Sequence, residues 1–482
     1  MFYQLSKNAF VRHYGDFVYY FNNLYRSDRM FQYAQIFAEK IGRIPILEEE
    51  ILHHIHTVYE KTPMDELQRD FRDFITVLAD EHFVLAGRTV EEMLATEQDF
   101  SYSMASPKTE RDSKAMPREE AAELSQKILG EYFEEHPTLF SLQLDITQAC
   151  TERCVHCYVP EYNALFLPFE KIKEVVDDFV AMGGLQISLS GGECMLHPDF
   201  ERIVEYIRAK DCTCSILSNL TLCDDSKVNL LKRLDCSVQV SLYSMDSAIH
   251  DAITQRFGSH FKTKNAIERL YRANVPVVIS CPTMRMNYDG YVKVMEYAES
   301  MKMRAQTDFI MMAKADHDQS NLVNRLTLEQ TRCLLEAIIL RDLPVEREYF
   351  NPKYKKDMQT PEERAERPLC GAGKDKMCLN ADGNYYACSG FQDYPLGNCY
   401  RQRLREVWEN SPQIKYLRGL RGKDIPKCIH CQNRNYCSMC LVRNFNETGN
   451  MLQVAEHFCR VAEINHQVVD ELHERIRHSQ GI

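Results

Sequence analysis

Three cysteines set close together constrain this chain more than any other feature of its sequence. Cys150, Cys154 and Cys157 are separated by three and then two residues. Thiolates at this spacing can close on one metal centre from a short loop, whereas a four-iron cluster has four irons to ligate. In such a cluster, one iron would stay open to a chelating substrate. A zinc knuckle, or three unrelated buried cysteines, is the alternative.

The composition places these cysteines in a large globular protein. The 482 residues suggest about three domains, and contents of 44% hydrophobic and 27% charged residues are globular values. We expect a cytoplasmic protein with no membrane partner, because no apolar run approaches the roughly twenty residues of a membrane span and the N-terminus lacks a signal-peptide pattern. The formal charge of −12 disfavours a nucleic-acid partner. Nineteen cysteines then indicate metal ligation in a reducing compartment.

Residues 1–88 read as short strands followed by helices. The stretch 17–21 is rich in β-formers and lies between turn signals, so it predicts a strand. Two helical patterns follow, each with its apolar residues on one face; they are Leu47, Ile51, Ile55 and Tyr59, then Leu67, Phe71, Phe74 and Leu78. This order predicts a small winged-helix-like α+β module, with 17–21 at an exposed edge. A packing extension of the next domain is the alternative.

Residues 89–117 turn polar and lose periodicity, which predicts a linker. Residues 118–312 begin with an expected helix at 118–135 and then alternate apolar runs with helical patterns. Repeated β-then-α units indicate parallel strands covered by helices, with the active site at the carboxyl ends of the strands. The expected strands are 141–147, 185–190, 214–218, 238–242, 275–281 and 305–310, and the expected helices are 170–182, 198–210, 226–234, 262–273 and 291–301.

Polar and glycine residues follow several of these strands. Gly191, Gly192 and Glu193 end the second strand, where glycines allow close backbone approach to a ligand and a carboxylate can accept from an ammonium group. Further candidates are Ser218 and Asn219 at the end of the third strand, Ser241 in the fourth, and Arg256 in the loop after it. Taken singly, such residues are more often turns, helix caps or solvated surface.

The cysteines return near the C-terminus. Residues 313–367 form a charged, proline-punctuated bridging segment with one expected helix at 328–340, and residues 368–482 form a cysteine-rich domain that ends in a helix at 454–478. Eight thiolates there could make two tetrahedral zinc centres or two iron–sulfur clusters, and spacing alone does not decide between them. The cysteines are Cys370, Cys378, Cys388, Cys428, Cys431, Cys437, Cys440 and Cys459.

The loop with the first three cysteines resembles the C-x3-C-x2-C signature of radical S-adenosylmethionine (SAM) enzymes. The resemblance implies a partial (β/α)6 barrel whose open iron binds the amino and carboxylate groups of SAM. One electron then cleaves SAM to methionine and a 5'-deoxyadenosyl radical. It further implies a set of SAM contacts: His156 beside the adenine, Gly191, Gly192 and Glu193 as the motif at the amino group, Ser218, Asn219 and Ser241 at the ribose and methionine moiety, and Arg256 at the carboxylate.

The later cysteines resemble the SPASM domain, a C-terminal extension of peptide-modifying radical SAM enzymes. The resemblance implies two auxiliary four-iron clusters, hence three 4Fe–4S clusters in all. By position, the first auxiliary cluster uses Cys370, Cys378, Cys388 and Cys440, and the second uses Cys428, Cys431, Cys437 and Cys459. Cys399 rivals Cys378. Two residues separate Cys437 from Cys440 where the family usually has three, which leaves open whether Cys440 crosses to the first cluster.

The N-terminal module resembles the leader-peptide recognition domain of peptide-modifying radical enzymes, whose strand edge pairs with an extended peptide. The whole chain thus resembles a radical SAM/SPASM peptide maturase. This implies a ribosomal precursor peptide with a leader as partner, a thioether, carbon–carbon or carbon–oxygen crosslink as product, and an electron donor such as flavodoxin or ferredoxin whose electron enters by an auxiliary cluster. Ser389 stands where sulfatase-maturing relatives have a catalytic aspartate, and no catalytic base is identified. Alternatives are a maturase of a folded protein, a small-molecule radical enzyme and a non-catalytic iron–sulfur scaffold.

Overall fold

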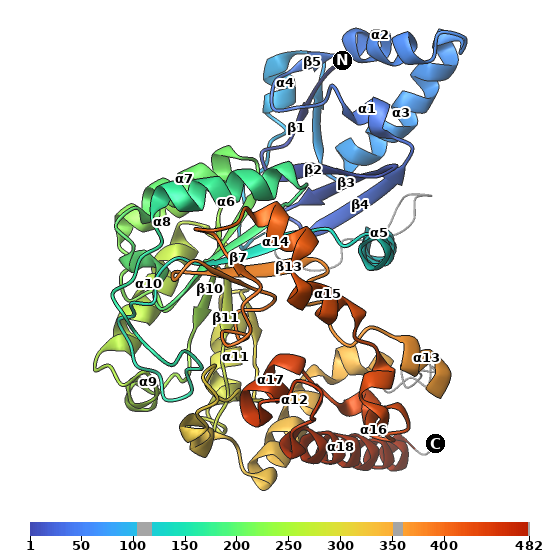
Figure 1. The fold of residues 1–482 in the computed structure, drawn as a ribbon. Helices are drawn as coiled ribbons and strands as arrows, with labels where there is room; N and C mark the ends of the chain where they lie inside the picture. Colours follow the sequence, from blue (N-terminus) through green and yellow to red (C-terminus); the bar gives the residue numbers. More distant parts are fainter. Residues whose placement is uncertain (104–117, 350–359, 481–482) are drawn as a thin grey trace.

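The computed structural model describes residues 1–103, 118–349 and 360–480 (Figure 1). A strand-and-helix module formed by the N-terminal residues lies at the top of Figure 1, a barrel of strands and helices lies below it, and the C-terminal helices lie at the lower right. In these ranges we find no helix that is both long and apolar enough to span a bilayer.

The barrel consists of six parallel strands in sequence order, as the alternating pattern predicts. They are β7 (Ser141–Asp145), β8 (Gln186–Ser190), β9 (Thr213–Ser218), β10 (Ser237–Ser241), β11 (Val277–Ser280) and β12 (Arg304–Gln306). The helices between them are α6 (Phe169–Ala181), α7 (Phe200–Ala209), α8 (Asp225–Arg233), α9 (Ser247–Thr254), α10 (Ser259–Arg272) and α11 (Tyr291–Ser300), with a 3-10 turn η1 (Cys194–Leu196). Of these helices, α9 has no counterpart in the sequence prediction.

The faces of the first strand show how the barrel interior acquires polar groups. Leu142 and Leu144 are fully buried in the core between sheet and helices. Because successive side chains point to opposite faces of a strand, Gln143 and Asp145 point into the barrel. The interior near the carboxyl end of β7 is therefore lined by groups that can form hydrogen bonds.

The barrel sheet continues into the cysteine-rich region. The strand β13 (Lys376–Asn380) pairs in parallel with β7, and β14 (Asn384–Tyr386) and β15 (Gly397–Asn398) extend the sheet to nine strands. One hydrophobic core spans both parts, since Leu379 and Tyr385 pack in the same cluster as the barrel strands. The predicted boundary at 367 and 368 therefore does not separate two cores.

The remaining C-terminal elements are mostly helices. The predicted helix at 328–340 is α12 (Leu328–Tyr349), and its side chains Leu335 and Ile339 pack against Val468 and Leu472 of the last helix, α18 (Glu456–Gln480). Between them lie α13 (Pro361–Glu366), α14 (Leu404–Asn410), α15 (Pro412–Gly419), α16 (Pro426–Ile429) and α17 (Leu441–Thr448). Short 3-10 turns are η2 (Ser320–Asn324), η3 (Gly422–Asp424) and η4 (Arg434–Tyr436).

The N-terminal module contains two three-stranded sheets, in the orders β5-β1-β6 and β2-β3-β4. The strands are β1 (Phe2–Leu5), β2 (Ala9–Tyr14), β3 (Phe17–Asn22), β4 (Ser27–Gln32), β5 (Ile46–Leu47) and β6 (Val84–Gly87), with helices α1 (Gln35–Ala38), α2 (Glu48–Val58) and α3 (Met64–Asp80). The predicted apolar faces of α2 and α3 are buried, except that Leu47 and Tyr59 at their margins are exposed.

The prediction that residues 17–21 form an exposed edge strand is wrong. They lie in β3, which is the central strand of its sheet and pairs with β2 on one side and β4 on the other. The outer edges are also partly occupied: the Ala9 carbonyl accepts from Arg43 at 2.6 Å, and the Met30 amide donates to Ser125 Oγ at 3.1 Å. A run of β-formers indicates a strand but not its neighbours.

The module is packed firmly onto the barrel. Phe10, Tyr14 and Tyr19 form one hydrophobic cluster with Phe133 of α5 (Arg118–Glu135) and other residues of the barrel side. Tyr14 also donates from its hydroxyl to the carbonyl of Gly183 at 3.0 Å. Backbone polar groups and apolar surface thus join the two parts, which fixes their relative orientation.

The first half of the predicted linker, residues 89–103, is folded and packs against the barrel. Residues 89–103 include the helix α4 (Val90–Leu94) and the buried side chain of Tyr102. The Tyr102 hydroxyl donates to the Val275 carbonyl at 2.8 Å and accepts from the Val277 amide at 3.0 Å, at the start of β11. Residues 104–117, the rest of the predicted linker, lie outside the described residues.

We predict that Tyr102→Phe destabilises the barrel. The substitution leaves two buried backbone groups without their partner, which costs about 1–3 kcal/mol. Urea unfolding of the full chain should therefore show a lower midpoint than the parent, while Tyr33→Phe, at an exposed tyrosine, should not. An unchanged midpoint for Tyr102→Phe would mean that this segment adds nothing to the stability of the barrel.

Candidate active site and cluster sites

The loop that carries the first three cysteines spans residues 146–168, between β7 and α6, at the carboxyl end of the barrel. Its two ends are held together, because Leu167 donates from its amide to the Ile146 carbonyl at 2.9 Å. Its middle is held by the end of α9, where the amides of Arg153 and Val155 donate to Thr254 and Ile253, each at 2.9 Å. The short helix α9 thus supports the cysteine loop from the far side of the barrel.

Two glycines clasp the loop from the end of β8. Gly192 donates from its amide to the Thr147 carbonyl at 2.8 Å, and Glu193 donates to the Ala149 carbonyl at 2.8 Å. A Cβ atom on Gly191 or on Gly192 would lie 2.2 Å from one of these same carbonyl oxygens. Gly191 also has a φ of 128°, which disfavours any side chain. Glycine is needed at both positions because two backbone segments touch here.

Glu193 connects the second strand to the third. Its carboxylate is fully buried and accepts from the Met195 amide at 3.0 Å, the Ser218 hydroxyl at 2.8 Å and the Asn219 amide at 2.9 Å. Burial raises the pKa of this carboxyl group, and these hydrogen bonds oppose the rise. Its observed contacts are thus internal to the protein, and its contact with an ammonium group stays a prediction.

Asn219, at the end of the third barrel strand, contacts the cysteine loop. Its side-chain amide donates to Thr151 Oγ1 at 2.9 Å and lies 3.9 Å from the sulfur of Cys150. Thr221 supports this arrangement, because its hydroxyl lies 2.8 Å from that of Thr151. The predicted residues at the ends of β8 and β9 are therefore gathered at the first cysteine.

Aromatic rings line the other side of the loop. His156 and Tyr243 meet with ring centroids 5.1 Å apart, and the Tyr243 hydroxyl lies 3.5 Å from His156 Nε2 and 3.7 Å from the sulfur of Cys154. Burial lowers the pKa of His156 to about 4, so its ring is neutral at pH 7. Ser241, at the end of β10, is close enough to Tyr243 to oppose the rise that burial causes in the pKa of the Tyr243 hydroxyl. Tyr243 was not predicted, although an aromatic residue directly after a buried strand was a signal for it.

Arg256 lies apart from this group. Its side chain is exposed in the turn between α9 and α10. In the described ranges its guanidinium has no ion pair with a carboxylate. Its predicted contact with the carboxylate of SAM stays untested, and its place at the surface gives it no support.

Two buried carboxylates were missed by the sequence analysis. Glu152 lies within the cysteine loop, its Oε2 accepts from the thiol of Cys154 at 3.5 Å, and burial raises its pKa to about 7. Asp145 ends β7 inside the barrel, and burial raises its pKa to about 6. Each is an acidic residue beside a buried or cysteine-bearing segment, which is the pattern that could have identified it.

The later cysteines fall into two groups. Burial, and then the neighbouring Cys440 and Cys388, raise the pKa of Cys370. In the same way, burial and the neighbouring Cys459 and Cys431 raise the pKa of Cys437. The groups are Cys370, Cys388 and Cys440, and then Cys428, Cys431, Cys437 and Cys459. Cys440 is close enough to Cys370 and Cys388 to raise their pKa, and its crossing to the first cluster stays a prediction.

Cys378 stands at the margin of the first group. It is buried in β13, and its thiol donates to Asp145 Oδ2 and Asn380 Oδ1, each at 3.4 Å. Burial raises the pKa of the Cys378 thiol, and the neighbouring Cys388 contributes to this rise. The pKa of the rival, Cys399, is instead raised mainly by burial, and its charged neighbours include Lys171 and Glu174. Which residue is the fourth ligand of the first auxiliary cluster stays open.

The arrangement of the thiols bears on the zinc alternative. Throughout the described part of the chain, no three His, Cys, Asp or Glu side chains are placed to hold a single metal ion. A tetrahedral zinc site requires its thiolates around one ion at about 2.3 Å. A four-iron cluster instead takes thiolates on separate irons. The positions of the thiols alone therefore leave both kinds of centre open, and the assignment to clusters rests on the resemblance to the SPASM domain.

We predict that Gly192→Ala displaces the cysteine loop. The added Cβ would meet a backbone oxygen, which cannot swing aside as a flexible side chain can. After anaerobic reconstitution, the variant should lack about four irons relative to the parent, the content of one cluster, and should not cleave SAM. The matched control is Gly130→Ala in α5, where a Cβ meets nothing within 4 Å. Full iron content and SAM cleavage in Gly192→Ala would contradict the clasp.

Comparisons with known proteins agree with these two kinds of site. Residues 144–298 match the model of the Radical SAM superfamily, and residues 370–440 match that of SPASM, an iron–sulfur cluster-binding domain. An AdoMet-dependent heme synthase of Methanosarcina barkeri is 24% identical over 335 residues, 65% of this chain and 94% of the relative. The subtilosin biosynthesis protein AlbA of Bacillus subtilis is 25% identical over 332 residues, 65% of this chain and 69% of the relative.

A solved structure resembles the fold of nearly the whole chain. The crystal structure of Streptococcus suis SuiB bound to the precursor peptide SuiA has a TM-score of 0.61 and 14% identity, and the match covers 92% of this chain and 97% of that one. The two matched family regions contain the cysteine loop with its glycine clasp and, in the later region, most of the second set of cysteines. This chain is therefore a radical SAM enzyme with a SPASM domain, and its cofactors are SAM and iron–sulfur clusters.

Proposed function

We propose that this enzyme modifies a ribosomally made precursor peptide, and that the reaction forms a thioether, carbon–carbon or carbon–oxygen crosslink. The observation that carries the proposal is the likeness of fold to a peptide-bound enzyme over 92% of this chain, because the likeness extends beyond the barrel and the SPASM domain. AlbA, a bacteriocin biosynthesis protein by name, adds support from sequence.

The residues of the barrel are suited to the cofactors. Cys150, Cys154 and Cys157 would hold a four-iron cluster, and SAM on its open iron would supply the 5'-deoxyadenosyl radical. The proposed SAM contacts are His156, Gly191, Gly192, Glu193, Ser218, Asn219, Ser241 and Arg256, of which all but Arg256 gather around the cysteine loop or at the strand ends beside it.

The protein itself must fix the position of the cysteine loop and of SAM and must exclude water from them. The clasp of Gly191 and Gly192, together with the support from α9, keeps the cysteine loop in one place. The rings of His156 and Tyr243 form a neutral wall beside it, since His156 does not carry charge at pH 7. A radical needs such a site, because water and loose side chains would divert it.

We assign the later cysteines to two auxiliary clusters, which makes three 4Fe–4S clusters in all. Cys370, Cys388 and Cys440 would hold the first, and the second group, Cys428, Cys431, Cys437 and Cys459, would hold the other. Ligation of the first cluster by Cys378 requires its thiol to give up the hydrogen bond to Asp145. Loss of that bond is the specific cost of the four-cysteine assignment.

We also assign leader recognition to the winged-helix-like N-terminal module, residues 1–88. Strand addition at 17–21 is not part of this assignment, since β3 has partners on both sides.

The remaining partner is an electron donor such as flavodoxin or ferredoxin. A second candidate function is radical chemistry on a small molecule, because the heme synthase matches over 94% of its own length.

The proposal predicts a mass change in a cognate peptide. The enzyme should be expressed anaerobically with the short peptides encoded beside its gene, and their masses measured. Each crosslink should remove two hydrogen atoms, because bond formation is a two-electron oxidation. The variant with alanine at Cys150, Cys154 and Cys157 is the control and should leave the peptides unchanged. An enzyme that cleaves SAM but modifies none of these peptides would speak for the small-molecule alternative.

Leader recognition predicts protection within the module. With the leader part of such a peptide bound to the full chain, amide hydrogen exchange should slow within residues 1–88, because binding suppresses local opening. The control is the remaining, leaderless part of the peptide, which should not protect these amides. Protection confined to the barrel would remove the assignment and leave the module as a packing extension.

A further inference from the structure

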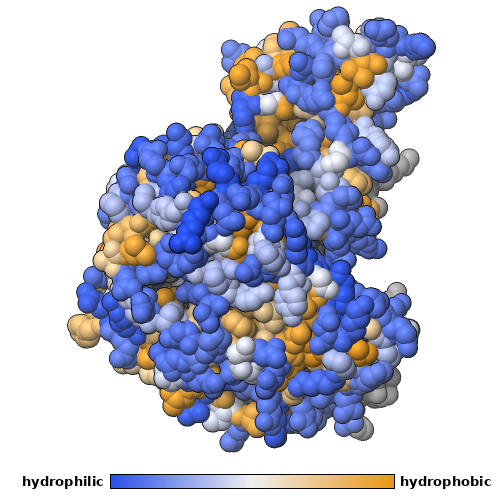
Figure 2. Space-filling view, viewed as in Figure 1, coloured by the Kyte–Doolittle hydropathy of each residue, from blue (hydrophilic) through white to orange (hydrophobic). Residues whose placement is uncertain are grey.

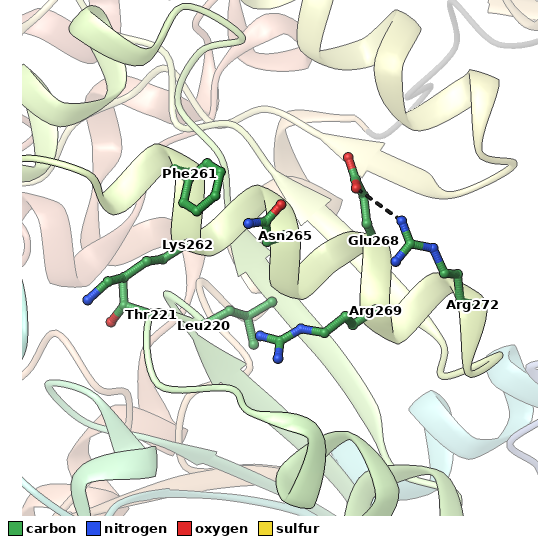
Figure 3. A pocket seen from close by; sticks show the side chains of 8 residues that line it. All are labelled: Leu220, Thr221, Phe261, Lys262, Asn265, Glu268, Arg269 and Arg272. Carbon is green, nitrogen blue, oxygen red and sulfur yellow. Dashed lines mark hydrogen bonds and ion pairs between the residues drawn. The ribbon is translucent and has the colours of Figure 1, made fainter.

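A groove with a volume of about 420 Å³ runs along the outer side of α10 (Figure 3). One side is formed by Leu220 and Thr221, in the loop after β9, and the other by the side chains of α10. Figure 3 shows Thr221 and Lys262 at one end of the groove and Arg272 at the other. We call this surface the α10 groove.

The α10 groove lies directly beside the first cysteine. Thr221, which lines it, has its hydroxyl 2.8 Å from Thr151, the residue after Cys150. Asn219 lies between the groove and the cysteine. Its side-chain carbonyl accepts from the amide of Thr221 at 3.0 Å, and its side-chain amide group lies 3.9 Å from the sulfur of Cys150. A molecule bound in the groove is thus one layer of side chains from the cysteine loop.

The groove is basic on a protein that is acidic overall. Lys262, Arg269 and Arg272 line it with a single carboxylate, Glu268, whereas the whole chain carries a formal charge of −12. Glu268 is already paired with Arg272 and with Lys264, and Asp225 is paired with Arg269. Within the described residues, Lys262 has no carboxylate partner. The excess of positive charge faces solvent.

The turn at the start of α10 adds apolar surface to this charge. Phe257 is 98% exposed and Phe261 is 69% exposed, and Arg256 is exposed beside them. Figure 2 shows hydrophobic side chains at the surface over α9 and α10, at the left edge of the view. A single exposed phenylalanine needs no explanation. Two of them four residues apart, with cations around them, have the make-up of a small protein interface with a charged rim.

We propose that the α10 groove and the turn with Phe257 and Phe261 form the docking surface for an acidic one-electron donor protein, such as one that carries a flavin or an iron–sulfur group. Its electron then passes directly to the cluster held by Cys150, Cys154 and Cys157, and not by way of an auxiliary cluster. In this step the donor loses one electron and the cluster gains one, and no proton or group is transferred. The proposal rests on the cluster assignment of the cysteine loop but not on the identity of the peptide.

Charge complementarity is the reason for an acidic partner. Electron-transfer complexes are small and short-lived, with interfaces below about 1,200 Å², so their rate depends on electrostatic steering of the encounter. A free lysine at the mouth of the groove, beside exposed rings, supplies both the steering charge and the apolar contact. Neither feature has another partner within the described chain.

The test compares two reductants on the full enzyme. SAM cleavage is measured with reduced flavodoxin and separately with dithionite, a small ion that needs no docking surface, for the parent, Lys262→Glu and Phe261→Ser. With flavodoxin, both variants should be slowed about three- to tenfold, as expected for loss of a steering charge or of apolar contact; with dithionite, they should match the parent. Raising the salt concentration should slow the flavodoxin reaction of the parent more than that of Lys262→Glu.

Two controls make the result specific. Lys415→Glu reverses an exposed charge on α15, remote in sequence from α10, and should keep both rates, and Lys262→Arg should keep the flavodoxin rate. Parent-like flavodoxin rates in Lys262→Glu and Phe261→Ser would overturn the proposal. So would slower peptide modification with dithionite together with unchanged flavodoxin-driven SAM cleavage, since the groove would then belong to the peptide. Absence of SAM cleavage with dithionite in the parent would instead refute the cluster assignment itself.

Discussion

The site depends on contact between two stretches of backbone: residues 191–193 at the end of β8 and residues 147–149 at the start of the cysteine loop. Hydrogen bonds from Gly192 and Glu193 hold the loop directly. The buried carboxylate of Glu193 then binds Ser218 and Asn219, and Asn219 returns to the loop beside Cys150. The contacts therefore close a ring through three neighbouring strand ends. Moving any one member would shift the thiols, because no part of the ring is free to absorb the change.

The second constraint is the shared sheet. Because β13 pairs with β7 over its full length, the cysteines that flank β13 are set at a fixed height relative to the loop that follows β7. Asp145 and Cys378 meet across this pair of strands. The barrel and the SPASM region are thus joined through one continuous sheet and one hydrophobic core.

Sequence patterns located the barrel well, because buried parallel strands are continuous apolar runs and the helices between them are amphipathic. They did not reveal α9, whose eight residues are too few for a clear period, or β13, whose short stretch drew attention only for its cysteine. The position of β3 within its sheet was predicted wrongly, since β-propensity carries no information on pairing. Among the site residues, the cysteines were predicted from their spacing and the motif glycines from their place at the end of a strand. Tyr243, Glu152 and Asp145 were missed, because their roles arise only when distant segments meet.

The firm packing of the N-terminal module has a consequence for any peptide bound there. Phe10, Tyr14 and Tyr19 fix the module against the barrel, so a leader held by it would be anchored at a constant distance from the radical site. The rest of the peptide would then search for the site as a tethered chain, at an effective concentration set by the number of residues between anchor and target. Residue count, more than local sequence, would decide which position reacts. The rigid joint would act as a molecular ruler.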